Sequence, residues 1–296
     1  MAAREVWDRP AAFYPEHVTA LRVLERAIDL APGDHVSWAY DDVAGLRQAC
    51  ADTFTEGAAR GEQLVYIGDR GHEELRDDLA GVDGRDALIE NGRLRIHSIA
   101  ELYHATGRFE PQAQVETFRV EAQRAVRDGY TGLRVVGDVT DVVADPDLHA
   151  DFVAYELALE AMYAVTPVVG ICAVDRTRAG ERWREISALH RVQHIAGHEP
   201  TFALTCSSGV VRLFGELDAS SVVELQRLLD AVLASTSGVL EVNLDGLDFI
   251  DVGASRVLAG AHQVMGCAQR ELLLTGVRRR TAAPLAAFNL SGGPGQ

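Results

Sequence analysis

Three histidines near residue 190 are the first residues whose spacing could do chemistry. His190, His194 and His198 recur at four-residue intervals on one expected helix, and histidines four apart on a helix can share a zinc ion. The stretch reads H-R-V-Q-H, without the glutamate that a metalloprotease needs. His198 lies at the expected helix end, shortly before Pro200, where a histidine interacts well with the helix dipole. We therefore predict no metal site and interpret 196–200 as an interdomain linker.

Residues for covalent or phosphate chemistry stand in no known catalytic frame. Gly68 to Gly71 (GDRG) follows an expected strand but lacks the lysine and hydroxyl of a P-loop, so we interpret it as a turn. No Gly-x-Ser-x-Gly and no kinase signature occurs. The sequence predicts no catalytic residues, names no cofactor and favours a protein that is not an enzyme. An atypical nucleotide-binding enzyme is the alternative.

Short apolar segments must position any ligand-binding residues. Strands are expected over 35–40, 63–67, 94–97, 133–138 and 168–175, and helices over 17–30, 43–60, 111–128, 152–165 and 181–196. This alternation predicts an α/β fold with a mostly parallel sheet and helices on both faces. Ligands of such sheets bind at the carboxyl ends of strands. Those ends are Tyr40 with Asp41, Gly68 to Gly71, Gly137 with Asp138, and Asp175 with Arg176.

The same segments resemble a known sensory domain. HVSWAYDD, then EQLVYIGDR, LRVVGDVTDV and YELALEAMYAVTPVVGICAVDRTR are similar to the MEDS domain of bacterial and archaeal regulators, over about residues 33–198. The resemblance implies a RecA/KaiC-like core without its Walker motif, and a role in sensing a small-molecule ligand of unknown identity. The positions that match, and that are expected to bind the ligand, are His35, Tyr40, Asp41, Arg70, Glu156, Asp175 and Arg176.

Several of these residues have a purely structural alternative. The alternatives are hydrogen bonding in the core for His35, packing for Tyr40 and a helix N-cap for Asp41. Glu156 is expected on an apolar helix, where a carboxylate faces solvent or is held by a cation. Arg70 and Arg134 are the candidate partners.

A second acidic turn lies in GVLEVNLDGLDFIDVGAS (238–255). It combines an apolar strand, a turn signal at Asp245-Gly246 and a helix that opens at Asp251. The start of a helix leaves backbone N–H groups unpaired and is a common place for recognition. Around it stand VVRLFGELD, a helix over 219–234, the strand ELLLTG and a short helix over 284–290.

This order of motifs, over about residues 201–291, resembles the STAS domain of anti-sigma-factor antagonists. The resemblance implies a small sheet backed by helices that docks a partner, either an anti-sigma factor or a related histidine-kinase-type ATPase. The docking surface would run from Asp248 to Leu258, with Gly215 to Ser220 beside it. Its expected docking residues are Asp218, Asp248, Asp251, Val252, Gly253 and Ser255.

One position departs from that family. A serine or threonine usually follows the residue that matches Asp251, and its phosphorylation breaks docking by repulsion and desolvation. Here Val252 has no hydroxyl, so the usual phosphoserine switch is not expected. We interpret Ser255 as a local cap or packing residue rather than a displaced phosphorylation site.

Composition limits the remaining classes. A length of 296 residues suggests about two domains, divided here into an arm and helix (1–32), a sensory domain (33–198) and a STAS-like domain (199–296). The net charge of −16 argues against nucleic-acid binding. No signal segment, no apolar run of about 18 residues and no C-x-x-C pair occurs, so a soluble cytoplasmic protein with free thiols and no membrane contact is expected. A scaffold of a signalling complex is the alternative function, and a homodimer is left open.

Overall fold

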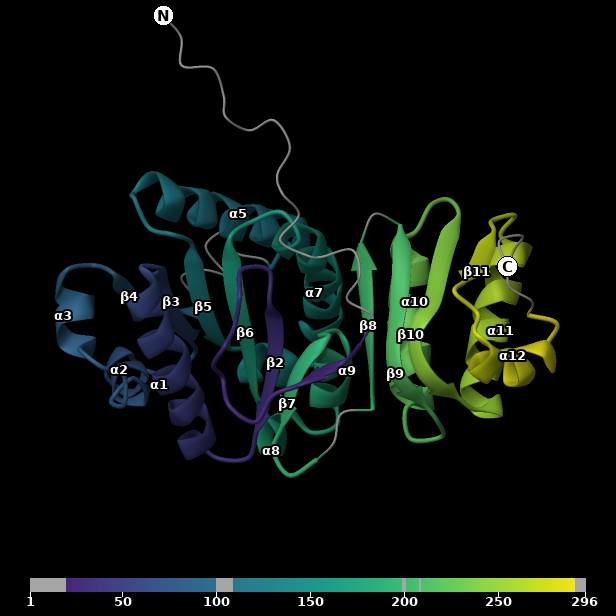
Figure 1. Cartoon of the computed structure of the whole chain (residues 1–296), viewed down its shortest axis with the longest axis horizontal. Helices are drawn as coiled ribbons and strands as arrows, with labels where there is room; N and C mark the ends of the chain where they lie inside the picture. Colours follow the sequence, from purple (N-terminus) through teal and green to yellow (C-terminus); the bar gives the residue numbers. More distant parts are fainter. Residues whose placement is uncertain (1–19, 100–108, 199–200, 208, 291–296) are drawn as a thin grey trace, which may run out of the picture.

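Two β-sheets, each with its own helices, organise the chain (Figure 1). The computed structural model describes residues 20–99, 109–198, 201–207 and 209–290. The first sheet has seven strands in the order β1-β7-β2-β6-β5-β3-β4, and every neighbouring pair is parallel. The second sheet has the order β11-β10-β9-β8 and is parallel except for the antiparallel pair of β8 and β9.

The elements of the first sheet alternate along the chain. Its strands are β1 (Arg22–Val23), β2 (His35–Tyr40), β3 (Gln63–Gly68), β4 (Leu94–Ser98), β5 (Leu133–Asp138), β6 (Val168–Asp175) and β7 (Val192–Ile195). Its helices are α1 (Val43–Arg60), α2 (His72–Asp78), α3 (Arg85–Glu90), α5 (Pro111–Arg127), α6 (Thr140–Ala144), α7 (His149–Tyr163), α8 (Arg176–Ala179) and α9 (Arg182–Ala188).

Helices cover both faces of this sheet, as the alternation predicts. All six residues of β2 are buried, which is typical of a parallel strand between two helical layers. Val36 and Trp38 pack in the cluster that contains the buried residues of α1, whereas Ala39 packs in the cluster that contains those of α7 and α9. Side chains two apart share a face of a strand, so β2 divides its residues between two cores.

The predicted helix over 43–60 is confirmed as α1, and its two ends show why it forms there. The side chain of Asp42 accepts a hydrogen bond from the backbone N–H of Gly45 at 2.9 Å, which satisfies one of the free donors of the first turn. Gly61 ends the helix at a φ of 82°, a left-handed conformation that glycine adopts without a Cβ penalty.

Two predicted helices are wrong. In place of the helix over 17–30, the described residues 20–30 form β1 and irregular backbone; residues 17–19 lie outside the described residues. In place of the helix over 181–196, α9 ends at Ala188 and the chain continues into β7. Since β7 pairs with both β1 and β2, its ladder of hydrogen bonds outweighs the helical spacing of its side chains.

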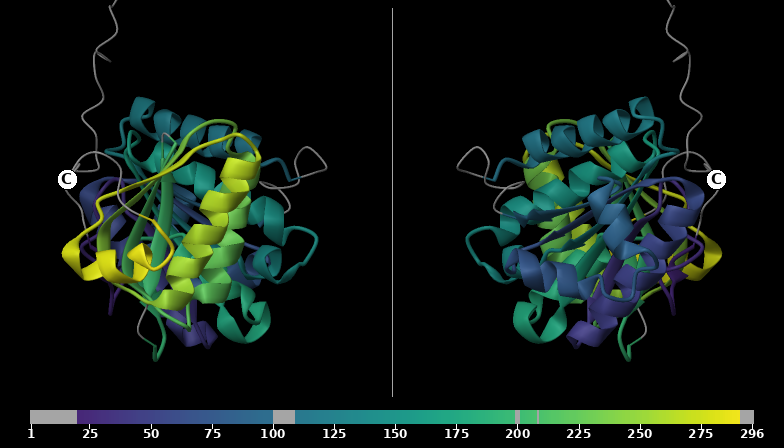
Figure 2. Two further views of the ribbon diagram at one scale, coloured as in Figure 1. Left: turned by 90° about the vertical axis from the view of Figure 1, so that its right-hand side faces the viewer. Right: turned by 90° about the vertical axis from the view of Figure 1, so that its left-hand side faces the viewer.

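The second sheet belongs to the C-terminal part of the chain. Its strands are β8 (Phe202–Ser207), β9 (Val210–Leu217), β10 (Leu240–Ile250) and β11 (Leu272–Thr275), with helices α10 (Val222–Ser235), α11 (Val252–Cys267) and α12 (Arg279–Ala286). Helices α10 and α11 lie side by side (Figure 2). Within the described residues, every helix is too short or too polar to span a bilayer.

The turn expected at Asp245-Gly246 is also wrong, because both residues lie inside β10. The register between β9 and β10 shifts between Asn243 and Gly246, as in a β-bulge. A Cβ at Gly246 would lie 2.4 Å from the ring of Phe214. The glycine therefore permits a close approach of two strands and does not reverse the chain.

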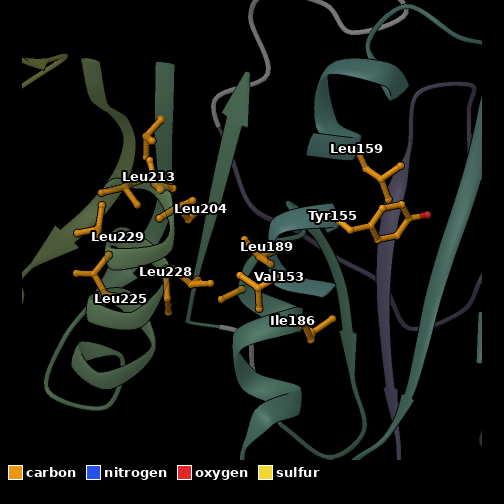
Figure 3. Close-up of a cluster of buried hydrophobic side chains, with 14 of the residues drawn as sticks. Val153, Tyr155, Leu159, Ile186, Leu189, Leu204, Leu213, Leu225, Leu228 and Leu229 are labelled. Carbon is orange, nitrogen blue, oxygen red and sulfur yellow. The ribbon is translucent and has the colours of Figure 1, made fainter. Parts of the chain in front are cut away.

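One continuous core joins the two parts. Leu204 of β8 and Leu225 and Leu228 of α10 belong to the same buried cluster as Val153 of α7 and Ile186 of α9, and Figure 3 shows these side chains across the junction. Helices α7 and α9 thus have the first sheet on one side and the C-terminal part on the other.

Candidate functional site

The residues expected to bind a ligand fall into two groups on opposite faces of the first sheet. His35 and Tyr40 are five positions apart on β2, so their side chains point to opposite faces. His35 meets Glu156 on the face that α7 and α9 cover, whereas Tyr40 and Arg70 meet on the α1 face through Asp138. The structure brings together the members of each group but does not bring the two groups into one pocket.

The first group is a buried cluster of four side chains from four segments, which we call the His-Glu-Cys cluster. It consists of His35 on β2, Glu156 on α7, Cys172 on β6 and His190 between α9 and β7. One ligand atom from each lies within 4.8 Å of the others.

The distances within the His-Glu-Cys cluster are short. The two histidine Nε2 atoms are 3.1 Å apart, and Oε2 of Glu156 lies 3.3 Å from Nε2 of His35 and 3.4 Å from Nε2 of His190. The Sγ atom of Cys172 lies 3.4 Å from Oε1 of Glu156 and 3.5 Å from Nε2 of His35. The nitrogen, oxygen and sulfur atoms of these four residues therefore lie around one small volume.

Burial dominates the electrostatics of this cluster. It lowers the pKa of His35 and of His190 to about 3 and raises the pKa of Glu156. It also raises the pKa of the Cys172 thiol, and the neighbouring Glu156 adds to that rise. Each shift favours the neutral form, because an apolar interior penalises charge.

Neighbouring groups fix the orientation of both histidine rings. Nδ1 of His190 donates to the carbonyl of Ile186 at 2.8 Å, which turns the Nε2 lone pair toward the other members of the cluster. The ring of His35 stacks on Tyr163 at 4.4 Å between centroids. Nδ1 of His35 and Oε2 of Glu156 have no hydrogen-bond partner among the described residues.

The partner expected for Glu156 is wrong. Arg134 is fully buried and pairs with Glu56 at 3.1 Å and with Glu62, and Arg70 pairs with Asp78. Glu156 has two histidines and a thiol instead. The spacing of apolar residues on α7 predicts that Glu156 is unusual, but not which elements lie opposite it.

Sequence reasoning missed Cys172 and His190 as members of this cluster. Cys172 is two residues from Gly170, which pairs with His35, so strand parity could have placed it on the same face. The helix expected over 181–196 includes His190, but α9 ends at Ala188. The three histidines at four-residue spacing therefore lie on different segments instead of on one helix face.

The second group lies at the carboxyl ends of the strands. Tyr40 donates to Asp138 at 3.2 Å, and Thr140 also donates to that carboxylate, at 2.6 Å. Burial raises the pKa of Asp138 and of Tyr40. Burial acts to lower the pKa of Arg70, but Asp78, Asp138 and two neighbouring tyrosines together outweigh burial, so the pKa is raised. Tyr40, Asp138 and Arg70 therefore each have a polar partner within the chain.

A chain of contacts leads from the strand ends to α9. Asp41 binds Arg176 through both oxygens at 2.6 Å, so Asp41 is not the helix cap, which is Asp42. Asp175 accepts from the backbone N–H of Thr177 at 2.9 Å. The guanidinium of Arg176 lies 5.3 Å from the ring centroid of Trp183, a cation–π distance.

A cavity of ≈ 90 Å³ lies at the junction of the two parts. Trp183 and Arg184 of α9 line it from one side, and Ser220 and Ser221 line it from the other. Gln193 crosses the junction nearby, since its Nε2 donates to the carbonyl of His190 at 2.6 Å and to that of Phe202 at 3.0 Å. One amide therefore ties the His-Glu-Cys cluster to β8.

The residues expected to dock a partner lie at one end of the second sheet. Asp251 caps α11 by accepting from the backbone N–H of Ala254 at 2.7 Å. Asp218 accepts from the backbone N–H and the hydroxyl of Ser220, and these bonds lower its pKa. Asp248 pairs with Arg280 at 3.1 Å.

Ser255 and Val252, the two positions that bear on phosphorylation, differ in exposure. Ser255 is fully buried and its hydroxyl donates to the carbonyl of Asp251 at 2.8 Å, as expected of a packing residue. Val252 is 52% exposed, and Phe249, three residues earlier in the chain, is 46% exposed. Gly253 follows, and a Cβ there would lie 3.4 Å from Val222 of α10. Exposed apolar side chains thus stand where the STAS resemblance leads us to expect a hydroxyl, beside the charged Asp248 and Asp251.

A seven-stranded parallel sheet with helices on both faces, followed by a four-stranded mixed sheet, defines the class as a two-part α/β protein. The family model described as MEthanogen/methylotroph, DcmR Sensory domain (MEDS) matches residues 34–191, which is more than half of the 296 residues. The chain belongs to the MEDS family. A model described as Mlab, STAS domain matches residues 201–292. Both resemblances and their order are confirmed. No curated protein matches the chain.

Proposed function

We propose that the MEDS domain senses a small ligand and thereby controls the docking of a protein partner on the STAS domain. A signalling regulator is what the two families imply together. The partner class that fits is an anti-sigma factor or a related histidine-kinase-type ATPase. The observation that carries the proposal is the position of α7 and α9 between the two sheets. On one side, α7 holds Glu156 and α9 ends shortly before His190. On the other side, both helices pack against β8 and α10.

The docking surface has features that suit a protein partner. Phe249 and Val252 are large apolar side chains exposed at the end where Asp251 caps α11, and exposed apolar residues beside polar ones mark interaction sites. Ser220 belongs to the same surface and lines the cavity that Trp183 closes from the MEDS side. A change in α9 therefore reaches the edge of the docking surface.

This arrangement gives a route of control that needs no phosphate. Val252 cannot be phosphorylated, so the accessibility of the surface has to depend on something else. A ligand shifts an equilibrium only through different affinities for two arrangements. The two arrangements we infer differ in how α7 and α9 pack on β8 and α10.

The first test replaces Val252 with a charged residue. Val252→Asp places a carboxylate at the first position of α11, where a negative charge suits the helix dipole, so the fold should be retained. We expect the affinity for an anti-sigma-type ATPase from the same genome to fall at least about tenfold, because an unpaired carboxylate is then buried against the partner. Isothermal titration calorimetry measures the affinity of each variant for the partner.

Val239→Asp is the matched control. Val239 is also an exposed valine, 54% against 52%, but it lies next to the opposite end of β10. Binding of this variant should equal that of the unchanged chain. If the Val252→Asp and Val239→Asp variants bind the partner with equal affinity, the surface around Val252 is not the docking surface.

A further inference from the structure

We propose that His35, Glu156, Cys172 and His190 form a four-coordinate site for a divalent transition-metal ion, with Zn²⁺ as the ion that the donor set fits. Two imidazoles, one thiolate and one carboxylate are the usual protein ligands of zinc. The four residues come from β2, α7, β6 and the segment before β7.

Three of the separations between ligand atoms match a tetrahedral ion, and all of the ligand atoms lie within 4.8 Å of one another. Bond lengths of about 2.0–2.3 Å in a tetrahedron place neighbouring ligand atoms about 3.3–3.6 Å apart. The separations of Oε2 of Glu156 from the two Nε2 atoms are 3.3 and 3.4 Å, and that of Sγ of Cys172 from Nε2 of His35 is 3.5 Å. The distance between the two Nε2 atoms, 3.1 Å, is slightly shorter.

The hydrogen bonds of the cluster leave its most polar atoms poorly satisfied. Only one proton fits between the two Nε2 atoms, and Oε2 of Glu156, which is fully buried, has no hydrogen-bond partner in the described part of the chain. A buried carboxylate without such a partner is costly. A doubly charged cation would balance one carboxylate and one thiolate and would use every inward lone pair.

The surroundings resemble those of a metal ligand. His190 donates its other ring nitrogen to a backbone carbonyl, that of Ile186, and a ligating histidine usually makes such a bond. Four protein ligands leave no open position, which is typical of a site that holds structure and not of one that performs catalysis. The ion would bind two strands of the sheet to α7 and to the segment after α9.

The regulatory consequence rests on the proposed function. Because Gln193 bonds the carbonyl of His190 to that of Phe202, loading of the site would fix one arrangement of the junction. Metal binding itself is independent of any partner and is measured first.

The experiment uses the full chain, stripped by a chelator and titrated with Co²⁺, followed by displacement with Zn²⁺. We expect one ion per chain, with a thiolate-to-cobalt charge-transfer band and the visible bands of tetrahedral Co²⁺, both lost when Zn²⁺ is added. No uptake by the unchanged chain, or uptake without the thiolate band, would overturn the site.

Variants assign the ligands. Cys172→Ser should abolish the thiolate band, and His190→Gln should weaken Co²⁺ binding at least about 100-fold, since even residues behind the ligands cost about 10–100-fold. Cys50→Ser and His194→Gln are the matched controls, because Cys50 is a buried free thiol on α1 and His194 stacks on Trp38 outside the cluster. Both controls should keep the band and the affinity. Loss of the band in Cys50→Ser would overturn the assignment.

Partner affinity is then compared between the zinc-loaded and the stripped chain. Different affinities support the regulatory consequence, and equal affinities with one bound ion overturn it while the site stands. A chain that docks its partner but binds no metal overturns the site and leaves the proposed function in place.

Discussion

At the scale of the residue, the absence of a side chain at Gly170 decides where Tyr163 lies. A Cβ at Gly170 would stand 1.8 Å from the hydroxyl oxygen of Tyr163, far closer than two non-bonded heavy atoms can approach. Tyr163 in turn stacks on His35, which opens β2 beside Gly170. The glycine therefore shapes the His-Glu-Cys cluster without belonging to it.

Gly170→Ala should destabilise the fold. The added methyl has to displace the ring of Tyr163, and overpacking of a core costs about 1–3 kcal/mol. Urea denaturation measures the loss of unfolding free energy. Adding Tyr163→Phe to this variant removes the 1.8 Å contact and should restore part of the loss.

The control for this prediction is Gly260→Ala in α11. A Cβ at Gly260 meets nothing within 4 Å, and alanine is favoured over glycine inside a helix by about 0.5–1 kcal/mol. The two alanine variants should therefore change stability in opposite directions. Equal effects would contradict the packing argument.

At the scale of the element, α9 joins the two domains through charge as well as through apolar packing. Glu185 accepts from His149 at 3.0 Å and also pairs with Arg227 of α10. Burial acts to raise the pKa of Glu185, but the hydrogen bonds and the charges of His149 and Arg227 together outweigh burial and hold the pKa below the ordinary value of 4.5. The ionised carboxylate is therefore the form that the folded chain prefers.

This shift predicts how stability depends on pH. Below its ordinary pKa, the unfolded chain binds more protons at Glu185 than the folded chain does, so stability falls as the pH falls. The contribution of Glu185 is complete above pH 4.5 and is lost as the pH falls through the folded pKa. The Glu185→Gln variant should be less stable than the unchanged chain at neutral pH, with a difference that shrinks in acid. A stability difference between the two chains that grows as the pH falls would contradict this prediction.

The element scale also shows how far spacing predicts structure. The strand over 35–40 and the helix over 43–60 are confirmed. The helix could be predicted because Asp42 and Gly61, which mark its two ends, are visible in the sequence itself. The segment after Ala188 has helical spacing of its histidines, yet it becomes β7 because β1 and β2 offer strands on both sides of it. Local pattern cannot report the presence of such partners.

At the scale of the whole molecule, the two domains share one core. Leu225 and Leu228 of α10 and Val153 of α7 are buried together. Domains that share a large apolar interface lose much of their burial when either unfolds, so we expect them to unfold as one unit.

Coincident unfolding transitions are the measurable form of this expectation. Hydrogen exchange of β2, which is buried in the first sheet, follows the MEDS domain, and hydrogen exchange of β10 follows the STAS domain. The two probes should give the same midpoint in urea. Two separate midpoints would show that the domains are independent, and control of docking through their junction would lose its basis.

The sequence by itself determined both families, their order, the class of the fold and the absence of a hydroxyl at Val252, since each depends on motifs and local periodicity within a short segment. It also pointed to His35 and Glu156 as unusual polar residues. Only the tertiary structure decided that Cys172 and His190 complete their cluster, that Arg70 and Arg134 pair elsewhere, and that α7 and α9 lie between the sheets. Those facts depend on which strands pair and which helices cover them, and contacts between residues far apart in the chain leave no trace in local spacing.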